Sequence, residues 1–207
     1  MRPRSTQGAD TKLRIIQIAA DLFHKQGVTA TSPDKIIEAS GTGKGQFYYY
    51  FKNKEGLVHQ VLQHHLDIIK AGASPIHYEI NSWLDLERWF LGHIALQRAF
   101  RMTRGCPFGT IGNEVTENDE LIRQDLSLIF ELVRAKLAAF FIREKAKDRL
   151  LKGVDEGQLA DYCISVAQGA MLLGKVKRDS RVVEAAMKEA LSHLKTYRTR
   201  PRARKPD

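Results

Sequence analysis

Apolar residues recur with helical spacing along most of the chain. Between Thr11 and Gln26 they fall at i, i+3, i+7 and i+10, which is one face of a helix. The same pattern predicts a short second helix that starts at Thr31–Asp34 and stops at Gly41, and a third short helix at the end of the segment 41–51. Further helices are predicted at about 54–69, 80–102, 107–116, 118–147, 156–177 and 180–197. No segment alternates with the period of a strand for long enough to compete. The predicted fold class is therefore all-α.

Local signals mark where several of these helices begin and end. Gly27 stands where a left-handed C-cap would close the first helix. The segment Thr31–Asp34 offers a hydroxyl cap, a proline for the first helical position and a carboxylate for the positive helix end. Gly41 follows the second helix, and Asp155 and Asp179 are suited to cap the last two.

A turn of three or four residues that begins at Gly41 joins two short helices, and this geometry is typical of a DNA-binding helix-turn-helix. In the second helix Phe47 and Phe51 lie four apart and would face the core. Lys44, Gln46 and the tyrosines 48–50 are left on the outer face and flanks. A lysine and a glutamine can bind base edges or phosphates in a DNA groove, and tyrosine hydroxyls can reach phosphates.

Two other interpretations of this segment were weighed. The aromatic run 47–51 could be core, but successive helical residues are about 100° apart, so three consecutive tyrosines cannot all face inward. The sequence Gly41–Gly45 also suggests a phosphate-binding loop. That loop requires Ser or Thr after the lysine and a preceding strand, whereas here Gly45 follows Lys44 and a helix precedes the turn.

The distribution of positive charge favours a nucleic-acid partner, because the basic residues are concentrated at the two ends of the chain. The net charge is +9. Residues 1–54 hold nine Lys and Arg against four Asp and Glu, and residues 195–207 hold six against one. Concentrated basic segments favour a polyanion as partner. For the C-terminal segment, a solvated disordered tail is an equal alternative.

Other composition features narrow the class of protein. The two cysteines, Cys106 and Cys163, lack metal-binding spacing, so we expect no disulfide and no metal site, and nothing calls for a cofactor. The N-terminus does not read as a signal peptide, and the longest charge-free apolar run, 162–174, is too short to span a bilayer. We therefore expect a cytoplasmic, nucleoid-associated protein with no membrane partner.

The chain resembles the TetR family of repressors from about Lys12 to Leu62. The resemblance includes the segment from Ala20 to Gly27, Thr31-Ser32, Ile36 and Gly41. It is most specific in the run Lys44-Gly45-Gln46-Phe47-Tyr48-Tyr49-Tyr50-Phe51, followed by Lys54-Glu55 and Leu57.

The chain departs from the family's pattern at Thr42 and Gly43, where an aliphatic residue and then Ser or Thr are usual. The recognition helix is therefore expected to be less well capped. Histidine is frequent in the family at the position of Tyr50, and the phenol of Tyr50 can still donate a hydrogen bond to a phosphate.

The resemblance implies which residues contact DNA. Thr31, Tyr48, Tyr50 and Lys54 match positions that grip phosphates, and Ser32 lies beside the first of them. Lys44, Gly45, Gln46 and Tyr49 match positions that face the groove. The expected contacts are therefore Thr31, Ser32, Lys44, Gly45, Gln46, Tyr48, Tyr49, Tyr50 and Lys54.

The resemblance also implies a larger second domain that binds an effector and dimerises through the last two helices. Residues 1–10 would be a basic arm, 11–60 the DNA-binding domain with its helix-turn-helix at about 31–51, 61–197 the effector and dimerisation domain, and 198–207 a basic disordered tail. Small residues at 167, 169, 170 and 174 would allow close helix–helix approach. An ordinary intramolecular core is the alternative interpretation.

The segment 104–109 resembles a Gly-Cys motif in a subgroup of the family, some members of which respond to electrophiles or oxidants. A thiolate near a helix N-terminus and a lysine gains reactivity. Cys106, with Lys175 supplying the charge, is therefore predicted as a sensor. A buried core residue is the alternative for Cys106 and the expectation for Cys163.

The sequence thus predicts a dimeric repressor that binds a palindromic operator. A small-molecule effector, or modification of a reactive cysteine, would release it from DNA. An enzyme is not expected, because the histidines are scattered and neither an HExxH motif nor a nucleophile elbow occurs. A helical protein-interaction scaffold with non-specific polyanion binding is the alternative.

Overall fold

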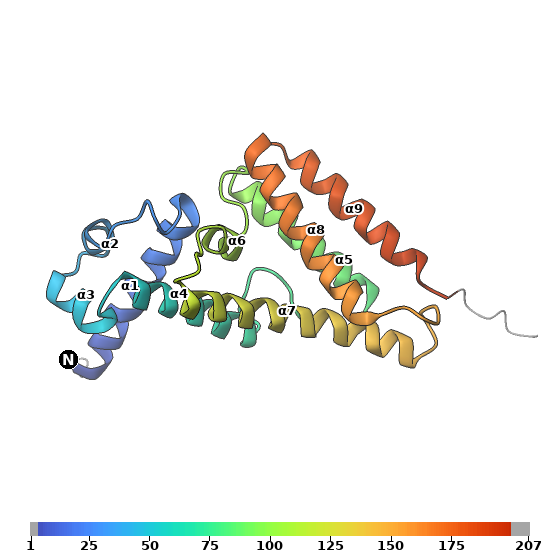
Figure 1. Ribbon diagram of the computed structural model, residues 1–207, viewed down its shortest axis with the longest axis horizontal. Coiled ribbons are helices and arrows are strands. Elements are labelled where there is room, and N and C mark those ends of the chain that lie inside the picture. The colour runs from blue at the N-terminus through green and yellow to red at the C-terminus, as the bar shows by residue number, and fades with distance from the viewer. Residues whose placement is uncertain (1–3, 200–207) are drawn as a thin grey trace, which may run out of the picture. The chain divides into compact units, whose positions relative to one another are not determined.

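The computed structural model describes residues 4–199, and within them it is built from helices (Figure 1). The helices are α1 (Arg4–Gln26), α2 (Pro33–Ser40), α3 (Lys44–Phe51), α4 (Lys54–Lys70), α5 (Trp83–Ala99), α6 (Pro107–Gly112), α7 (Glu120–Ala146), α8 (Glu156–Lys177) and α9 (Ser180–Thr196). Strand-like pairing in this range is limited to an isolated bridge between Leu150 and Arg198. The predicted all-α class is confirmed.

The predicted helix ends are largely confirmed. Ser32 caps α2 by accepting the N–H of Lys35, and Gly41 closes α2 with φ 61°. Asp155 and Asp179 cap α8 and α9 through their carboxylates. The clearest difference is α1, which begins at Arg4 and not near Thr11. Residues 4–10 carry no apolar pattern that would have predicted their helical state.

The chain forms two compact units, and each combines segments that are distant in the sequence. The first unit extends to Ala73 and also includes Thr103–Ile129. The second contains Ser74–Met102 and the chain from Phe130 onward. The first unit therefore holds α1–α4, α6 and the start of α7, and the second holds α5, the rest of α7, α8 and α9.

Each unit has its own hydrophobic core. In the first unit the buried side chains include Ile15, Phe23, Ile36, Phe47, Leu57, Leu62, Ile111 and Leu126. In the second unit α8 and α9 lie side by side with α5 against them (Figure 1), and the core includes Leu86, Phe90, Leu137, Phe140, Met171, Val183 and Met187. None of the helices in residues 4–199 combines the length and apolar character of a membrane span.

Most of the small residues of α8 are used inside the second unit. Ala167 and Ala170 are buried, and a Cβ placed on Gly174 would lie 2.4 Å from Cγ2 of Val183 on α9. Glycine at 174 therefore lets α8 and α9 approach closely. Gly169 differs, because a Cβ there would meet nothing within 4 Å.

Candidate nucleic-acid interface

The recognition segment is a short helix held by two buried aromatic rings. Phe47 and Phe51 are buried with ring centroids 5.6 Å apart, as predicted from their spacing. At the end of α3, a Cβ on Gly56 would lie 2.3 Å from the carbonyl oxygen of Phe51. Only glycine allows α4 to start this close to α3, with Asn53 capping α4 at 2.7 Å from the N–H of Gly56.

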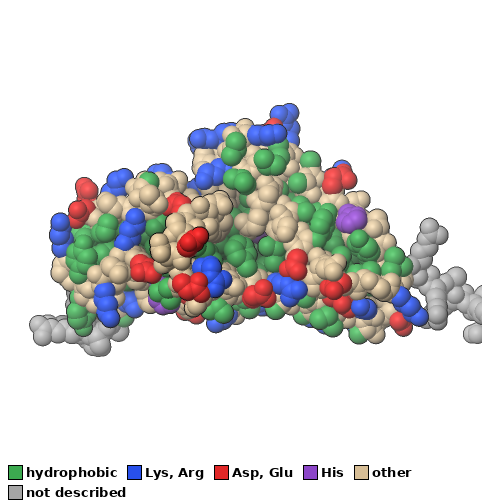
Figure 2. Space-filling model, in the orientation of Figure 1, with side chains coloured by type: hydrophobic (Ala, Val, Ile, Leu, Met, Phe, Trp, Pro, Cys, Tyr) green, Lys and Arg blue, Asp and Glu red, His purple; other side chains and the backbone are tan. Residues whose placement is uncertain are grey.

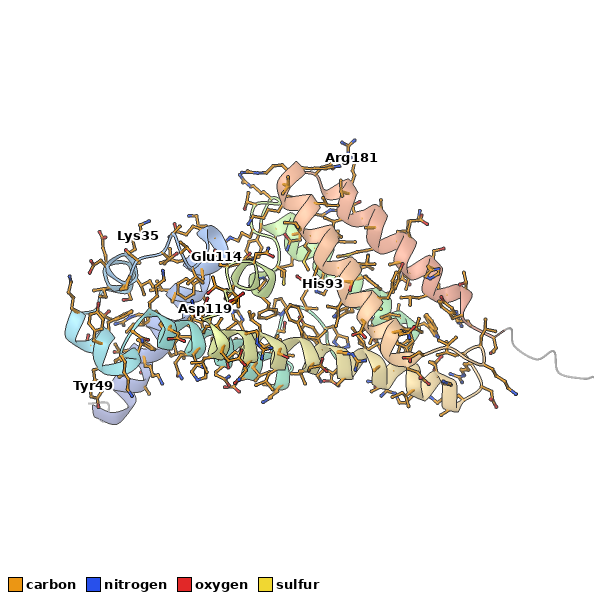
Figure 3. All side chains as sticks on the ribbon, viewed as in Figure 1. Lys35, Tyr49, His93, Glu114, Asp119 and Arg181 are labelled. Atoms are coloured by element: carbon orange, nitrogen blue, oxygen red, sulfur yellow. The ribbon has the colours of Figure 1, made fainter. Side chains whose placement is uncertain are left out.

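The outer face of α3 carries the polar groups. Tyr49 is 82% exposed, the highest value among the large apolar or aromatic side chains that are exposed. Tyr48, Lys44 and Gln46 are also exposed, and Tyr50 is half-buried. Figure 2 shows Lys and Arg side chains among hydrophobic-coloured ones, which include tyrosine, over the end of the first unit formed by α2 and α3. In Figure 3 Tyr49 is on the outer surface of that unit.

The start of α3 has a cap of unusual kind. Gly43 is the N-cap and has no side chain with which to cap the helix. The side chain of Gln46 accepts the N–H of Gly43 at 3.4 Å instead. The hydrogen bond from Gln46 thus partly replaces the side-chain cap that Gly43 lacks. Gln46 is also one of the residues predicted to face the DNA groove.

Lys44 and Lys54 lie in different electrostatic settings. The Nζ of Lys44 lies 3.0 Å from a carboxylate oxygen of Asp34 on α2, and this hydrogen bond raises the pKa of Lys44. Both side chains are exposed, so the pair contributes little to stability. Lys54 is half-buried, and its desolvation lowers its pKa against the attraction of Glu114. Both lysines belong to the first unit.

Thr31 and Ser32 take part in the turn before α2. Thr31 is fully buried, and its hydroxyl donates to the carbonyl of Gly27 at 2.6 Å and accepts from the side chain of Gln26. In this arrangement the Thr31 side chain offers no surface to a phosphate, in contrast to what the resemblance implies. Ser32 is exposed, with its oxygen engaged as the cap of α2.

Glu114 is a functional candidate to which sequence analysis assigned no role. Its carboxylate accepts the N–H of Thr29 at 2.6 Å and that of Val28 at 3.2 Å. Gly27, at φ 87°, lies directly beneath it, and a Cβ there would lie 2.1 Å from the carboxylate. Glu114 thus holds the turn between α1 and α2 from a position just after α6. The contact spans more than eighty residues, so no local pattern signals it.

The other end of α6 is also attached to α1. The side chain of His24 donates from Nε2 to the carbonyl oxygen of Gly105 at 2.9 Å. Arg104 pairs with Asp21. Cys106, the N-cap of α6, follows immediately and is half-buried. The six residues of α6 are therefore anchored to α1 before the helix and to the turn between α1 and α2 after it.

A cavity of about 350 Å³ lies beside Glu114 in the first unit. Its apolar wall includes Val58, Ile111 and Ile122, and its polar wall includes Lys54 and Glu114. Glu114 and Asp119 are labelled near one another in Figure 3, where α6 leads into α7. Asp119 is engaged in capping, because its carboxylate accepts from the N–H and the hydroxyl of Thr116.

The predicted sensor residues belong to different units. Cys106 is part of the first unit and Lys175, on α8, is part of the second. Cys163 is fully buried, and burial raises the pKa of its thiol, as expected for a core residue. Across residues 4–199 the structure places no three His, Cys, Asp or Glu side chains in a group that could hold a metal ion.

Comparison with known proteins identifies relatives over nearly the whole chain. Residues 15–61 match the family described as bacterial regulatory proteins, tetR family, and residues 86–190 match the tetracyclin repressor-like C-terminal domain. An HTH-type transcriptional regulator of Lactococcus lactis, encoded in the lacX 3' region, is 31% identical over 85% of this chain and 89% of its own. The repressor DhaR of a Mycobacterium species is 24% identical over 80% of this chain and 82% of its own.

Solved structures share the fold. A TetR transcriptional regulator from Chloroflexus aurantiacus superposes with a TM-score of 0.80 at 18% identity, covering 93% of this chain and 98% of its own. The reduced form of NemR from Escherichia coli superposes with a TM-score of 0.74 at 20% identity, covering 94% of this chain and 100% of its own.

Replacing Glu114 tests its hold on the turn between α1 and α2. Glu114→Ala removes a charged acceptor from two partly exposed N–H groups, so we expect a loss of about 1 kcal/mol in duplex-DNA binding, which is about fivefold in affinity. Fluorescence anisotropy measures the affinity, and hydrogen exchange at Val28 and Thr29 reports the turn. Glu117→Ala, an exposed glutamate nearby, is the matched control. Unchanged DNA affinity together with faster exchange would contradict the positioning role.

Proposed function

Since the chain belongs to the TetR family of bacterial transcriptional regulators, we propose that it is a repressor whose dimer binds a palindromic operator and leaves it on binding an effector or on modification of Cys106. The family consists of DNA-binding regulators and not of enzymes. TetR regulators bind operator DNA as dimers and respond to small-molecule ligands. We further propose that the protein acts in the cytoplasm, at the nucleoid.

We assign base recognition to the outer face of α3. Tyr49 and Gln46 are exposed there, and Lys44 needs only to exchange Asp34 for a phosphate or a guanine. Glutamine can pair bidentately with adenine, and lysine with guanine. The exposure of Tyr49 carries this proposal, because a large aromatic side chain so open to solvent has no role in the core.

Backbone phosphates would be bound around this face. The exposed phenol of Tyr48, the half-buried Tyr50 and the ammonium of Lys54 supply donors. Gly45, in the first turn of α3, leaves the backbone N–H groups open to a phosphate. Ser32 remains a proposed phosphate contact through its exposed position. Such contacts set the orientation of the protein on DNA but carry no base specificity.

We assign the dimer interface to the last two helices. On α8 the exposed residues Leu172, Leu173 and Val176 follow Gly169, where a Cβ would meet nothing. Val176 is 71% exposed. An apolar stripe next to a glycine allows a second copy of the helix to approach closely, and a two-fold dimer presents the same patch from both subunits.

We assign effector release to changes that reach α6. Cys106 is half-buried at the start of α6, and Glu114, just beyond its other end, holds the turn before α2. A change at either end of α6 can therefore alter the position of α2 and α3. Such a change releases DNA only if the modified or liganded state disfavours the DNA-bound arrangement.

Selection of duplex DNA from a random pool tests the operator proposal. We expect an enriched inverted repeat, because two recognition helices of a dimer read half-sites one helical turn apart. Gln46→Ala should relax the preference at one base pair by about 1–3 kcal/mol. Gln158→Ala, an exposed glutamine on α8, is the control. Binding with no enriched sequence and a steep salt dependence would favour the scaffold alternative.

A charge on the exposed stripe of α8 tests the dimer interface. Val176→Glu should shift the dimer toward monomer by tenfold or more in dissociation constant, because a carboxylate would be buried without a partner. Analytical ultracentrifugation measures the change. Leu84→Glu, on an exposed apolar position of α5, should leave the dimer intact. An unchanged dimer in the Val176 variant would place the interface elsewhere.

Alkylation tests the sensor role of Cys106. Treatment with N-ethylmaleimide should release the selected operator from the wild-type protein, and Cys106→Ser should abolish that release. Cys163→Ser serves as the control, because its buried thiol is not accessible. Release that persists in the Cys106→Ser protein would rule out this cysteine as the sensor.

A further inference from the structure

A buried stripe of polar side chains runs along one face of α5 in the second unit. Trp89, His93 and Gln97 stand at i, i+4 and i+8, so they share one side of the helix. All three are buried, and α5 packs against α8 and α9. Figure 3 labels His93, the second of the three. Side chains with polar groups at three successive turns are unexpected on the side of a helix that faces the core.

The two tryptophans of the chain provide an internal comparison on the same helix. Trp83 donates its indole N–H to a carboxylate oxygen of Glu144 at 2.8 Å. The indole nitrogen of Trp89 is wholly buried and meets no acceptor among the residues that the structure describes. A buried donor without an acceptor costs free energy that folding alone does not recover.

His93 places an acceptor beside this donor. Its Nδ1 lies 2.8 Å from the carbonyl oxygen of Trp89, so Nδ1 carries the proton and donates. Burial lowers the pKa of His93 to about 4, and the ring is therefore neutral near pH 7. The unprotonated Nε2 is an acceptor. The rings of Trp89 and His93 meet edge to face with centroids 4.6 Å apart.

We propose that Trp89 and His93 form a recognition subsite for an uncharged effector that offers an acceptor oxygen to the indole N–H and a hydroxyl to Nε2 of His93. The proposal rests on the effector response in the proposed function and adds the chemistry of the molecule that is recognised. An apolar body suits the surroundings, because the ring centroid of the buried Phe90 lies 4.9 Å from that of Trp89. The amide of Gln97, which lies 3.6 Å from the sulfur of Met171, is a third polar group along the same stripe.

The absence of charge in the stripe decides between ligand classes. Trp89, His93 and Gln97 carry no net charge near pH 7, so an ionised ligand would lose its hydration without gaining a counter-charge from them. Burying a lone charge is far more costly than burying a hydrogen-bonded neutral group. A neutral molecule in which a carbonyl and a hydroxyl lie close together matches the donor and the acceptor at once.

Indole NMR tests the subsite without DNA. Protein with ¹⁵N-labelled tryptophan gives one indole signal each for Trp83 and Trp89, assigned with Trp83→Phe. The probe is phenacyl alcohol, a neutral molecule with adjacent carbonyl and hydroxyl groups. We expect it to move the Trp89 signal to lower field and to leave Trp83 unchanged, because Trp83 is already bonded to Glu144. Mandelate, its anionic analogue, and propylbenzene, which lacks polar groups, should bind at least tenfold more weakly.

Two substitutions separate the donor from the acceptor. Trp89→Phe removes the indole N–H and His93→Phe removes Nε2, and each should weaken phenacyl alcohol about tenfold. Thermal melting checks that each variant is folded. A signal of Trp89 that stays in place up to the solubility limit of the probe would overturn the subsite, and this result needs no variant.

Operator release by the same probe distinguishes the subsite from the function on which it rests. A shift of the Trp89 signal with release of the selected operator supports both. A shift without release keeps the subsite and contradicts its effector role. Release with the Trp89 signal unmoved overturns the subsite and leaves the proposed function standing.

Discussion

The proposed DNA-reading surface depends on the burial of two phenylalanine rings beneath α3. A helix of eight residues is not stable in isolation, because its few hydrogen bonds do not offset the cost of nucleation. Phe47 and Phe51 fix it to the core of the first unit, and their positions on the helix force Gln46 and Tyr49 outward. The rigidity of this surface is therefore that of the core below it, and Gly56 keeps the following helix in close contact.

The turn before α2 depends on a longer-range interaction. Glu114 accepts two backbone N–H groups there, and Gly27 is the residue that makes room for its carboxylate. Because α6 is tied to α1 near His24 as well, the helix cannot shift without straining the turn. The position of α2 and α3 therefore depends on residues far away in the sequence, which gives a regulator of this family a physical route from effector chemistry to DNA.

Features set by local chemistry could be predicted from the sequence, and features set by distant contacts could not. The caps at Ser32, Asp155 and Asp179 follow from neighbouring residues, as does the outward face of α3. At Thr31 the residue type suits a phosphate contact, but the geometry of the turn directs its hydroxyl to Gly27. The packing of Thr103–Ile129 with the N-terminal helices likewise leaves no local signal.

Buried polar groups that serve stability have hydrogen-bond partners within the protein. The indole N–H at the proposed ligand subsite does not. In the first unit, the buried carboxylate of Asp125 accepts from both His59 and Gln63 at 2.7 Å. In the second unit, Glu144 satisfies Trp83 in the same manner. Among the described residues, the indole nitrogen of Trp89 is the buried side-chain nitrogen or oxygen left without a partner. Because the other buried side-chain nitrogens and oxygens of the described residues have partners, this unsatisfied donor points to a functional role; folding by itself would favour an apolar residue there.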